Sequence, residues 1–277
     1  MRVRHGPDID RPVVSLIILS PAQPLGVALP AARHNTLWAL ANMACCNENM
    51  THMAHQPGLL DVVTQAAHAV DESGTNQLAA LPLQHSAFRC LLNLSCEPRN
   101  KMHLSQREDL VDAIRRTVET RHAPRSASGD VGARRLQTRL FALGTLRNLA
   151  HAPPPHKRRL CTTQVLNVLC GAARSGREPS VRDKAVAVVF NLVSSDTAQI
   201  IVAHPGLLGS LVDAASMPVN CQEASSAYNA SIMACRALNA LHQMTSRGPE
   251  ACHASVRAAI ERVSRPPRCP SITPVPD

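Results

Sequence analysis

The sequence predicts an all-α protein, folded as a solenoid of about five stacked helical repeats. Three observations lead to this prediction. The composition is poor in strand-forming residues, one apolar helical pattern ending in asparagine recurs along the chain, and a Pro-Gly corner recurs at a matching place between helices.

The first observation is the amino-acid composition. With 277 residues, of which 45% are hydrophobic, the chain can bury a sizeable core. It has only 3 Phe, 1 Tyr, 1 Trp and 12 Gly, whereas sandwiches, barrels and propellers need aromatic bulk and turn glycines. The composition therefore favours helices over sheets.

The recurring pattern places apolar residues at helical spacing and ends in Asn followed by a small or apolar pair. Its five copies cover 37–44, 88–95, 143–150, 186–193 and 233–240, and their asparagines, here called the asparagine ladder, are Asn42, Asn93, Asn148, Asn191 and Asn239. Successive asparagines are 51, 55, 43 and 48 residues apart. Polar stretches at 71–76 and 122–132 read as inserted loops, and without them the period approaches the roughly 40–47 residues of helical repeat units.

A second element recurs ahead of the third helix of the unit. The segments 55–63 and 203–212 share the order His, Pro, Gly, Leu, Leu, in which Pro-Gly ends one short helix and Leu-Leu begins another. Each unit is therefore predicted to contain a short helix, a corner, a second helix, a loop and a third helix.

These features resemble the armadillo repeat family, whose units carry a glycine corner and a third helix of the form A-x-x-A-L-x-N-L-A. Leu146–Ala150 and Trp38–Asn42 match that form most closely, and the resemblance covers about 13–253. The corners at 106–110 and 162–165 lack glycine and the fifth unit is loose, so these units could also be closer to HEAT-like pairs.

The resemblance implies a right-handed armadillo-like superhelix over residues 13–263. Residues 13–19 would be the second helix of an incomplete first unit, and residues 249–263 the first helices of an incomplete last one. We expect a flexible N-terminus at 1–12 and a disordered Pro-rich tail at 264–277.

Catalytic motifs are absent from the sequence. It contains neither G-x-x-x-x-G-K-[ST], nor G-x-G-x-x-G, nor G-x-S-x-G, so we expect no enzyme activity and no cofactor. The one tempting metal cluster is Cys45, Cys46, His52 and His55, but adjacent cysteines point about 100° apart on a helix. We therefore expect no metal; a hydrolase using Cys and His would require one.

The ten cysteines are scattered singly through apolar segments with a helical pattern, among them Cys90, Cys170 and Cys235. Reduced and mostly buried thiols are the simpler interpretation, which favours the cytoplasm or nucleus. No apolar run approaches the roughly 20 residues of a membrane span. The apolar stretch 13–19 could pass for a signal-peptide core, but it follows Asp8, Asp10 and Pro12, and a core helix is the better interpretation.

The positive charge is concentrated between Arg121 and Arg159, where nine Lys and Arg stand against Asp130 alone. An association with nucleic acid is therefore the alternative function. The segment lacks the aromatic residues of a stacking platform except Phe141, and Arg135 and Arg139 fall roughly opposite the asparagine on their helix.

The asparagine ladder carries the main functional hypothesis. Asparagine is a poor mid-helix residue, so its recurrence calls for a structural hydrogen bond to the next repeat or for a ligand. By the resemblance, third helices line a concave surface whose asparagines hold the backbone of an extended peptide. One turn earlier, on the same helix face, lie Trp38, Arg89, Gly144, Ala187 and Cys235.

The sequence thus predicts a non-catalytic protein–protein interaction scaffold or adaptor. Because Arg89 and Arg147 accompany the ladder, we expect an acidic or phosphorylated peptide partner. The predicted groove residues are Trp38, Asn42, Arg89, Asn93, Arg147, Asn148, Asn191 and Asn239.

Overall fold

The computed structural model describes residues 28–68, 77–119, 129–175, 178–216 and 224–264, and every regular element in these ranges is an α-helix. The all-α prediction is therefore confirmed. The predicted N-terminus 1–12, the predicted helix 13–19, the polar stretch 71–76 and the tail from 265 lie outside the described residues. The predicted loop 122–132 is wrong at its end, because residues 129–132 form the first turn of a helix.

Four complete three-helix units follow one another, preceded by α2 and followed by α15. The helices are α2 (Ala28–Met43), α3 (Asn47–His55), α4 (Leu59–Ala67), α5 (Gln77–Leu94), α6 (Pro98–Ser105), α7 (Glu108–Glu119), α8 (Gly129–Leu149), α9 (Pro154–Leu160), α10 (Thr163–Ala173), α11 (Pro179–Leu192), α12 (Ser195–Ala203), α13 (Leu207–Ala215), α14 (Ala224–Arg247) and α15 (Glu250–Ser264). The units are α3–α5, α6–α8, α9–α11 and α12–α14. In place of the first helices predicted for the incomplete last unit, the structure has a single helix, α15.

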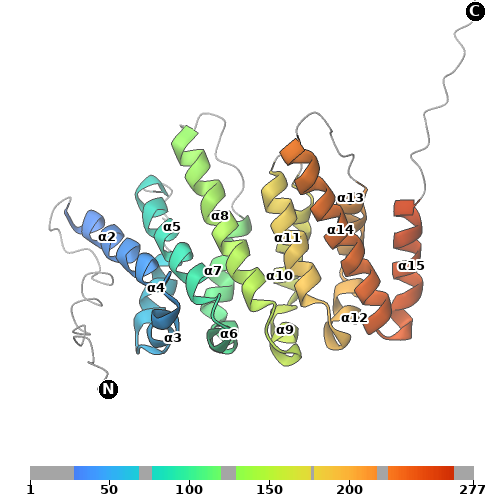
Figure 1. Ribbon diagram of the computed structural model, residues 1–277, viewed down its shortest axis with the longest axis horizontal. Coiled ribbons are helices and arrows are strands. Elements are labelled where there is room, and N and C mark those ends of the chain that lie inside the picture. Colours follow the sequence, from blue (N-terminus) through green and yellow to red (C-terminus); the bar gives the residue numbers. More distant parts are fainter. Residues whose placement is uncertain (1–27, 69–76, 120–128, 176–177, 217–223, 265–277) are drawn as a thin grey trace, which may run out of the picture.

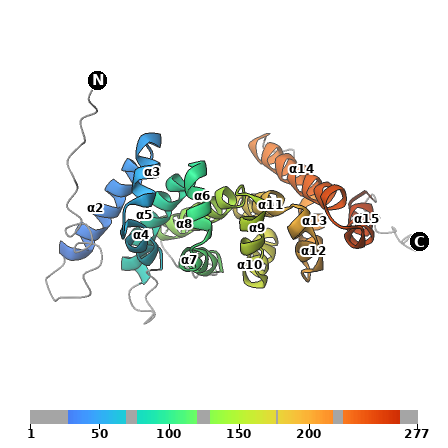
Figure 2. The same ribbon diagram turned by 90° about the horizontal axis from the view of Figure 1, so that it is seen from below.

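The third helices of the units form one layer of the solenoid. Figure 1 shows α2, α5, α8, α11 and α14 side by side in a row, with the short first helices along the lower edge. Seen from below, the row is curved, and the second helices α4, α7 and α10 lie on its outer side (Figure 2). The third helices therefore line the hollow side of the solenoid, here called the concave face.

One continuous hydrophobic core runs through the stacked units. Each third helix contributes fully buried apolar residues, such as Leu91, Leu146 and Val188. Where α8 crosses α5, Gly144 permits a close approach, since a Cβ atom at that position would lie 2.9 Å from Cδ1 of Leu92. Stacking by direct contact between neighbouring units is what places the asparagines of the ladder in register.

The corners between first and second helices are built in two ways. Gly58 and Gly206 adopt the left-handed conformation, with φ of 78° and 80°, which costs glycine nothing and other residues about 1–2 kcal/mol. The corner before α10 has no glycine; there the Thr162 side chain accepts a hydrogen bond from the Val165 N–H at 3.3 Å, which caps the helix. The repeat therefore keeps its geometry without glycine at every corner.

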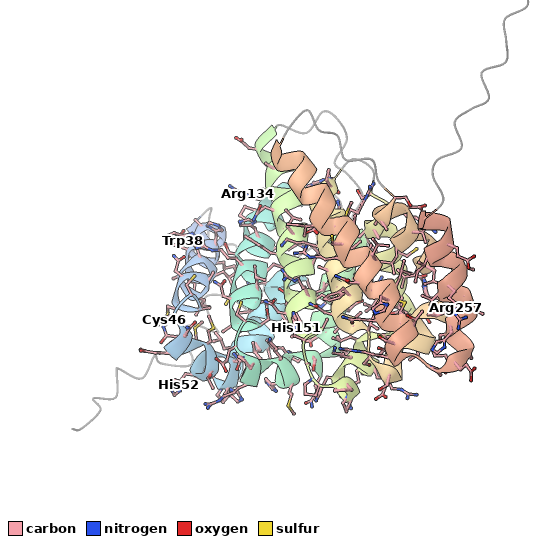
Figure 3. All side chains as sticks on the ribbon, turned by 45° about the vertical axis from the view of Figure 1, so that its right-hand side comes forward. Trp38, Cys46, His52, Arg134, His151 and Arg257 are labelled. Atoms are coloured by element: carbon pink, nitrogen blue, oxygen red, sulfur yellow. The ribbon has the colours of Figure 1, made fainter. Side chains whose placement is uncertain are left out.

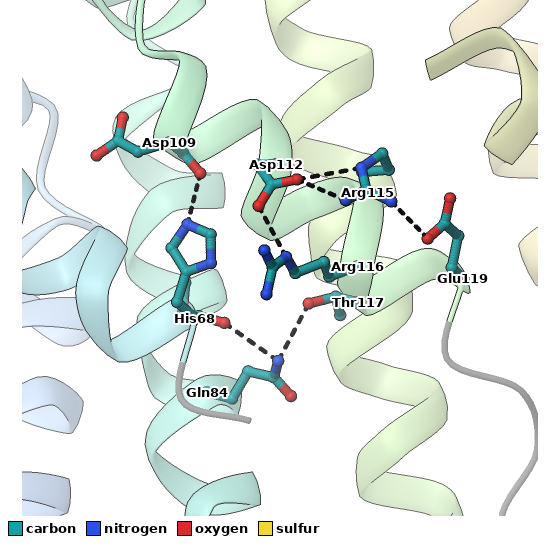
Figure 4. A network of polar contacts seen from close by, with 9 residues as sticks. His68, Gln84, Asp109, Asp112, Arg115, Arg116, Thr117 and Glu119 are labelled. Carbon is teal, nitrogen blue, oxygen red and sulfur yellow. Dashed lines mark hydrogen bonds and ion pairs between the residues drawn. The ribbon is translucent and has the colours of Figure 1, made fainter. Parts of the chain in front are cut away.

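Polar contacts on the outer side tie the second helices to their neighbours (Figure 4). Gln84 on α5 donates to the Ala67 carbonyl and to Thr117 Oγ1, each at 3.1 Å, so that one amide joins α4, α5 and α7. The His68 ring donates to the backbone carbonyl of Asp109 at 2.7 Å. These polar groups therefore have hydrogen-bond partners within the fold.

None of the described helices is, by itself, long and apolar enough to cross a membrane. The pair α12 and α13 meets the length and composition criteria only when taken together, and it bends by 94° at its corner.

Candidate functional site

The asparagines of the ladder occupy equivalent places near the ends of their helices. Asn42, Asn93, Asn148 and Asn191 are each the penultimate residue of a third helix, whereas Asn239 lies eight residues before the end of α14. The mid-helix premise was therefore wrong for four of the five. Near a C-terminus asparagine is less costly, and the free carbonyls of the neighbouring helix end offer it partners.

Three of these asparagines use their amide nitrogen inside the fold. Nδ2 of Asn93 donates to the Ala41 carbonyl at 2.9 Å. Nδ2 of Asn148 donates to Ser95 Oγ at 3.0 Å, and Nδ2 of Asn191 donates to the Arg147 carbonyl at 3.3 Å. Each bond runs to the preceding unit. The amide nitrogens thus help to hold the repeats together, as the structural alternative supposed.

The amide oxygens of the same three residues face the other way. Among the described residues none donates to Oδ1 of Asn93, Asn148 or Asn191, and none of these oxygens is a buried atom without a partner. The acceptor groups opposite Nδ2 fix the amide orientation, because carbonyl oxygens only accept hydrogen bonds. Three members of the ladder therefore keep an amide oxygen that no group in the described structure uses.

The two ends of the ladder differ from its centre. Oδ1 of Asn42 accepts a hydrogen bond from Nη2 of Arg89 at 2.9 Å, so both groups are engaged with each other. Asn239 is exposed, and its side chain has no hydrogen bond within the described part of the chain. The residues predicted for the site thus lie on one layer of helices but are not equivalent.

The positions one turn before each asparagine also vary along the row. Trp38 at one end is 52% exposed (Figure 3), and Cys235 near the other end is exposed as well. Gly144 and Ala187 in the middle are buried, because the third helices pack closely there. Trp38 and Cys235 are therefore exposed at these positions, and Arg89 on α5 is half-buried.

The sequence predicted Arg147 as a site residue, and the structure places it with four further basic residues where the central helices end. We call Lys101 on α6, Arg147 on α8, His151 after α8, Lys157 on α9 and Arg247 on α14 the basic cluster. Figure 3 shows His151 near the middle of the row. Arg147, His151 and Lys157 lie in the basic segment noted in the sequence, whereas nothing in the sequence linked them to Lys101 or Arg247.

Asn191 connects the ladder to the basic cluster. Nδ2 of Asn191 lies 2.8 Å from Nε2 of His151, and the Asn191 carbonyl accepts a hydrogen bond from Nζ of Lys157 at 2.6 Å. Since the amide nitrogen is a donor, Nε2 of His151 accepts, and the neutral ring carries its proton on Nδ1. Both side chains are therefore held in defined positions beside the ladder.

The cations of the cluster repel one another. The pKa of His151 is lowered by burial and by the charges of Lys101, Arg147 and Lys157. The pKa of Lys157 is lowered by burial and by Arg247. In the described structure no carboxylate contributes to either shift. In the described structure Lys101, Arg147, Lys157 and Arg247 form no ion pair.

Other basic residues of the 121–159 segment lie elsewhere. Arg139 forms an ion pair with Glu178 and donates to the Val118 carbonyl at 3.1 Å. Arg134 precedes Arg147 by 13 residues on α8, or about 20 Å along the helix. The charge of this segment is thus divided between the two ends of a helix and does not form one continuous surface.

The cysteines partly contradict the sequence prediction. Of the eight described cysteines, all unpaired, Cys90, Cys161, Cys170 and Cys252 are buried, whereas Cys45, Cys46, Cys96 and Cys235 are exposed. Burial raises the pKa of Cys90 and Cys161 to about 12. The sequence prediction of mostly buried thiols assumed that each cysteine faces the core. This assumption fails for cysteines at helix ends and on the concave face.

Within the described residues no three His, Cys, Asp or Glu side chains gather as metal ligands.

No protein-family model and no curated protein matches the chain. Several solved structures match the chain. A designed armadillo repeat protein for modular peptide recognition aligns with a TM-score of 0.57 at 17% identity, covering 91% of this chain and 98% of its own. A designed armadillo repeat protein in complex with the peptide (KR)4 gives 0.57 at 16%, covering 92% and 99%. The SYS-1/POP-1 complex gives 0.57 at 13%, covering 91% of this chain and 43% of that one.

The fold is that of an armadillo-repeat solenoid. This likeness extends over nine-tenths of the chain at low identity, so it supports the armadillo fold and leaves the chemistry of the concave face to its own residues. The expected third-helix lining of an armadillo solenoid is present here as α2, α5, α8, α11 and α14.

Proposed function

We propose that this protein is a non-catalytic interaction scaffold of the cytoplasm or nucleus, whose concave face binds an extended acidic or phosphorylated peptide. The observation that carries the proposal is the row of open acceptors at Asn93, Asn148 and Asn191, whose nitrogens are engaged in the fold. A row of acceptors at a regular spacing suits the backbone N–H groups of an extended chain.

The spacing of such a row agrees with this role. Helices of neighbouring units pack about 10 Å apart, and an extended chain advances about 3.3 Å per residue. In an extended chain with the threefold polyproline II repeat, the N–H groups of every third residue face one side, so one asparagine oxygen would meet every third peptide residue. Because backbone N–H groups are present whatever the side chains, the ladder supplies affinity with little sequence preference.

The charge of the concave face selects the peptide. The basic cluster lies beside Asn191 and has no carboxylate partner in the described structure, so acidic side chains gain Coulomb energy there. The designed armadillo protein above binds (KR)4, a basic peptide. For the present chain the opposite preference is expected.

The test uses two fluorescein-labelled octapeptides, (Asp-Glu)4 and (Lys-Arg)4, followed by fluorescence anisotropy at low and moderate salt. We expect (Asp-Glu)4 to bind and (Lys-Arg)4 to bind at least about 10-fold more weakly. Equal affinity for both peptides, or no binding of (Asp-Glu)4, would overturn the proposal. Tight binding of duplex DNA with a steep salt slope, unchanged by ladder substitutions, would favour the nucleic-acid alternative.

A change in the peptide tests the ladder without disturbing the protein. Replacing alternate backbone amides of (Asp-Glu)4 by esters removes every second N–H group. Because successive contacts are three residues apart, this removes about half of them in any register. We expect a loss of about 5- to 30-fold in affinity, since each net hydrogen bond contributes about 1 kcal/mol. An unchanged affinity would show that the ladder oxygens do not hold the backbone.

A further inference from the structure

We infer that the basic cluster is a binding site for the phosphate group of a phosphoserine or phosphothreonine in the bound peptide. The inference rests on the proposed function, since it places the phosphate on the same extended chain that the ladder would hold. The proposed function does not say where the preference for phosphorylated peptides arises, and this inference assigns it to the basic cluster.

The first argument is that basic groups from four helices and one connecting segment lie within charge-interaction range of His151 or Lys157. Lys101, Arg147, Lys157 and Arg247 belong to α6, α8, α9 and α14, which are separated by up to about half of the chain. Two guanidinium groups provide planar forks that match phosphate oxygens, and the ammonium groups add point charges. In the described ranges neither Arg147, Arg247 nor Lys101 forms an ion pair, so their charged ends are open to a ligand.

The second argument is the orientation of His151. Its Nε2 accepts from Asn191, which leaves the Nδ1–H group as a donor on the remaining edge of the ring. Lys157 is fixed by the carbonyl of the same asparagine. Asn191 thus sets both a peptide contact and two members of the cluster, which places the phosphate on a residue close to the one whose N–H meets Asn191.

The third argument is the amount of charge. Elsewhere on the third helices the fold provides its own counter-charges, as in the Arg236–Asp183 and Arg139–Glu178 ion pairs. Four cations, with no carboxylate contributing to the pKa shift of His151 or Lys157, exceed what one carboxylate would neutralise. A phosphate monoester carries nearly two charges and three strong acceptor oxygens at neutral pH, so it relieves the mutual repulsion more completely.

The experiment compares three nine-residue peptides of the form (Asp-Glu)2-X-(Asp-Glu)2, with phosphoserine, Glu or Ser as X. The repeating flanks let the peptide shift until X reaches the cluster. By anisotropy, phosphoserine should bind about 10-fold more tightly than Ser and about 3-fold more tightly than Glu. Free inorganic phosphate, added as a competitor, should weaken the phosphoserine peptide selectively.

Substitutions locate the effect. Arg247→Gln and Lys101→Gln should each reduce the phosphoserine-to-Ser affinity ratio from about 10 to about 3. Arg257→Gln removes the same charge from α15, at the far end of the row (Figure 3), and should leave the ratio unchanged. Circular dichroism melts of all three variants confirm that the fold is kept, and neither Arg247 nor Lys101 has a side-chain hydrogen bond within the described residues.

The outcomes separate this inference from the proposed function. If (Asp-Glu)4 binds but phosphoserine gives no advantage over Ser, the inference is wrong and the scaffold proposal stands. It is equally wrong if the advantage survives both Arg247→Gln and Lys101→Gln. If no acidic peptide binds, with or without phosphate, the proposed function fails together with it.

Discussion

Two regions of the concave face have the same helical layout and different chemistry. Between α2 and α5, Nη2 of Arg89 donates to Oδ1 of Asn42, so the amide oxygen is occupied and the guanidinium is held in place. Between α8 and α11, the ladder asparagine Asn191 binds the Arg147 backbone, and the Arg147 side chain stays open beside His151. A repeated position therefore does not guarantee a repeated role, because the neighbouring cation decides whether the amide oxygen is occupied.

This difference suggests that the two regions of the concave face make different kinds of contact with a bound peptide. Trp38 and the Asn42–Arg89 pair form an end that offers an exposed aromatic ring and one cation whose position Asn42 fixes. The central region offers open acceptors and the basic cluster. If the scaffold proposal holds, the centre selects charge and the α2 end contributes apolar contact.

The largest expected effect concerns the stability of the central ladder. Asn191→Ala removes hydrogen bonds to the Arg147 carbonyl and to His151 at a buried position. We expect the free energy of unfolding to fall by about 2–3 kcal/mol, as measured by urea denaturation followed by circular dichroism. Asn239→Ala, on an exposed helix face, should cost less than about 0.5 kcal/mol. Equal losses in the two variants would contradict the structural role assigned to the central amide nitrogens.

A second effect should separate the two arginines that accompany the ladder. Arg147→Gln should weaken binding of (Asp-Glu)4 by about 5-fold, because the Arg147 charge is not satisfied within the described fold. Arg89→Gln should weaken it by about 2-fold or less, because Arg89 is held by Asn42. Anisotropy titrations of both variants against the same peptide measure the two losses. The reverse order would show that the α2 end carries the acidic selectivity.

A third effect is a pH dependence of stability from the central region. The pKa of His151 is lowered by burial, then by Lys101, Arg147 and Lys157, so the folded state resists protonation. The unfolded chain takes up this proton near pH 6.5, and stability therefore falls as the pH drops below that value. Melting curves between pH 7.5 and 5.5 should show a smaller loss for His151→Gln than for the parent chain.

The sequence predicted the fold because its signals are local. The Pro-Gly corners at Gly58 and Gly206 and the asparagine pattern each lie within about ten residues of sequence, and stacking repeats them. The basic cluster could not be predicted in this way, since Lys101 acts on His151, and Arg247 on Lys157, across units that are far apart in the sequence.

The direction of individual side chains was also beyond the sequence. Equal spacing suggested that the positions one turn before each asparagine share one surface, yet Trp38 is exposed and Gly144 is buried. The separation between neighbouring third helices decides this, and it depends on residues in the adjacent unit such as Leu92. The use of Nδ2 within the fold, with Oδ1 left open, follows from the same packing.

Site-resolved alkylation of cysteine tests most directly whether a peptide lies along the ladder. Sγ of Cys45 accepts from Asn93 at 3.1 Å and Sγ of Cys96 accepts from Asn148 at 3.4 Å, and both residues are exposed. Mass spectrometry would follow iodoacetamide labelling with and without saturating (Asp-Glu)4, with buried Cys90 as the unreactive control. The account predicts that the bound peptide slows labelling of both Cys45 and Cys96. Unchanged rates at both residues while the peptide is bound would contradict it.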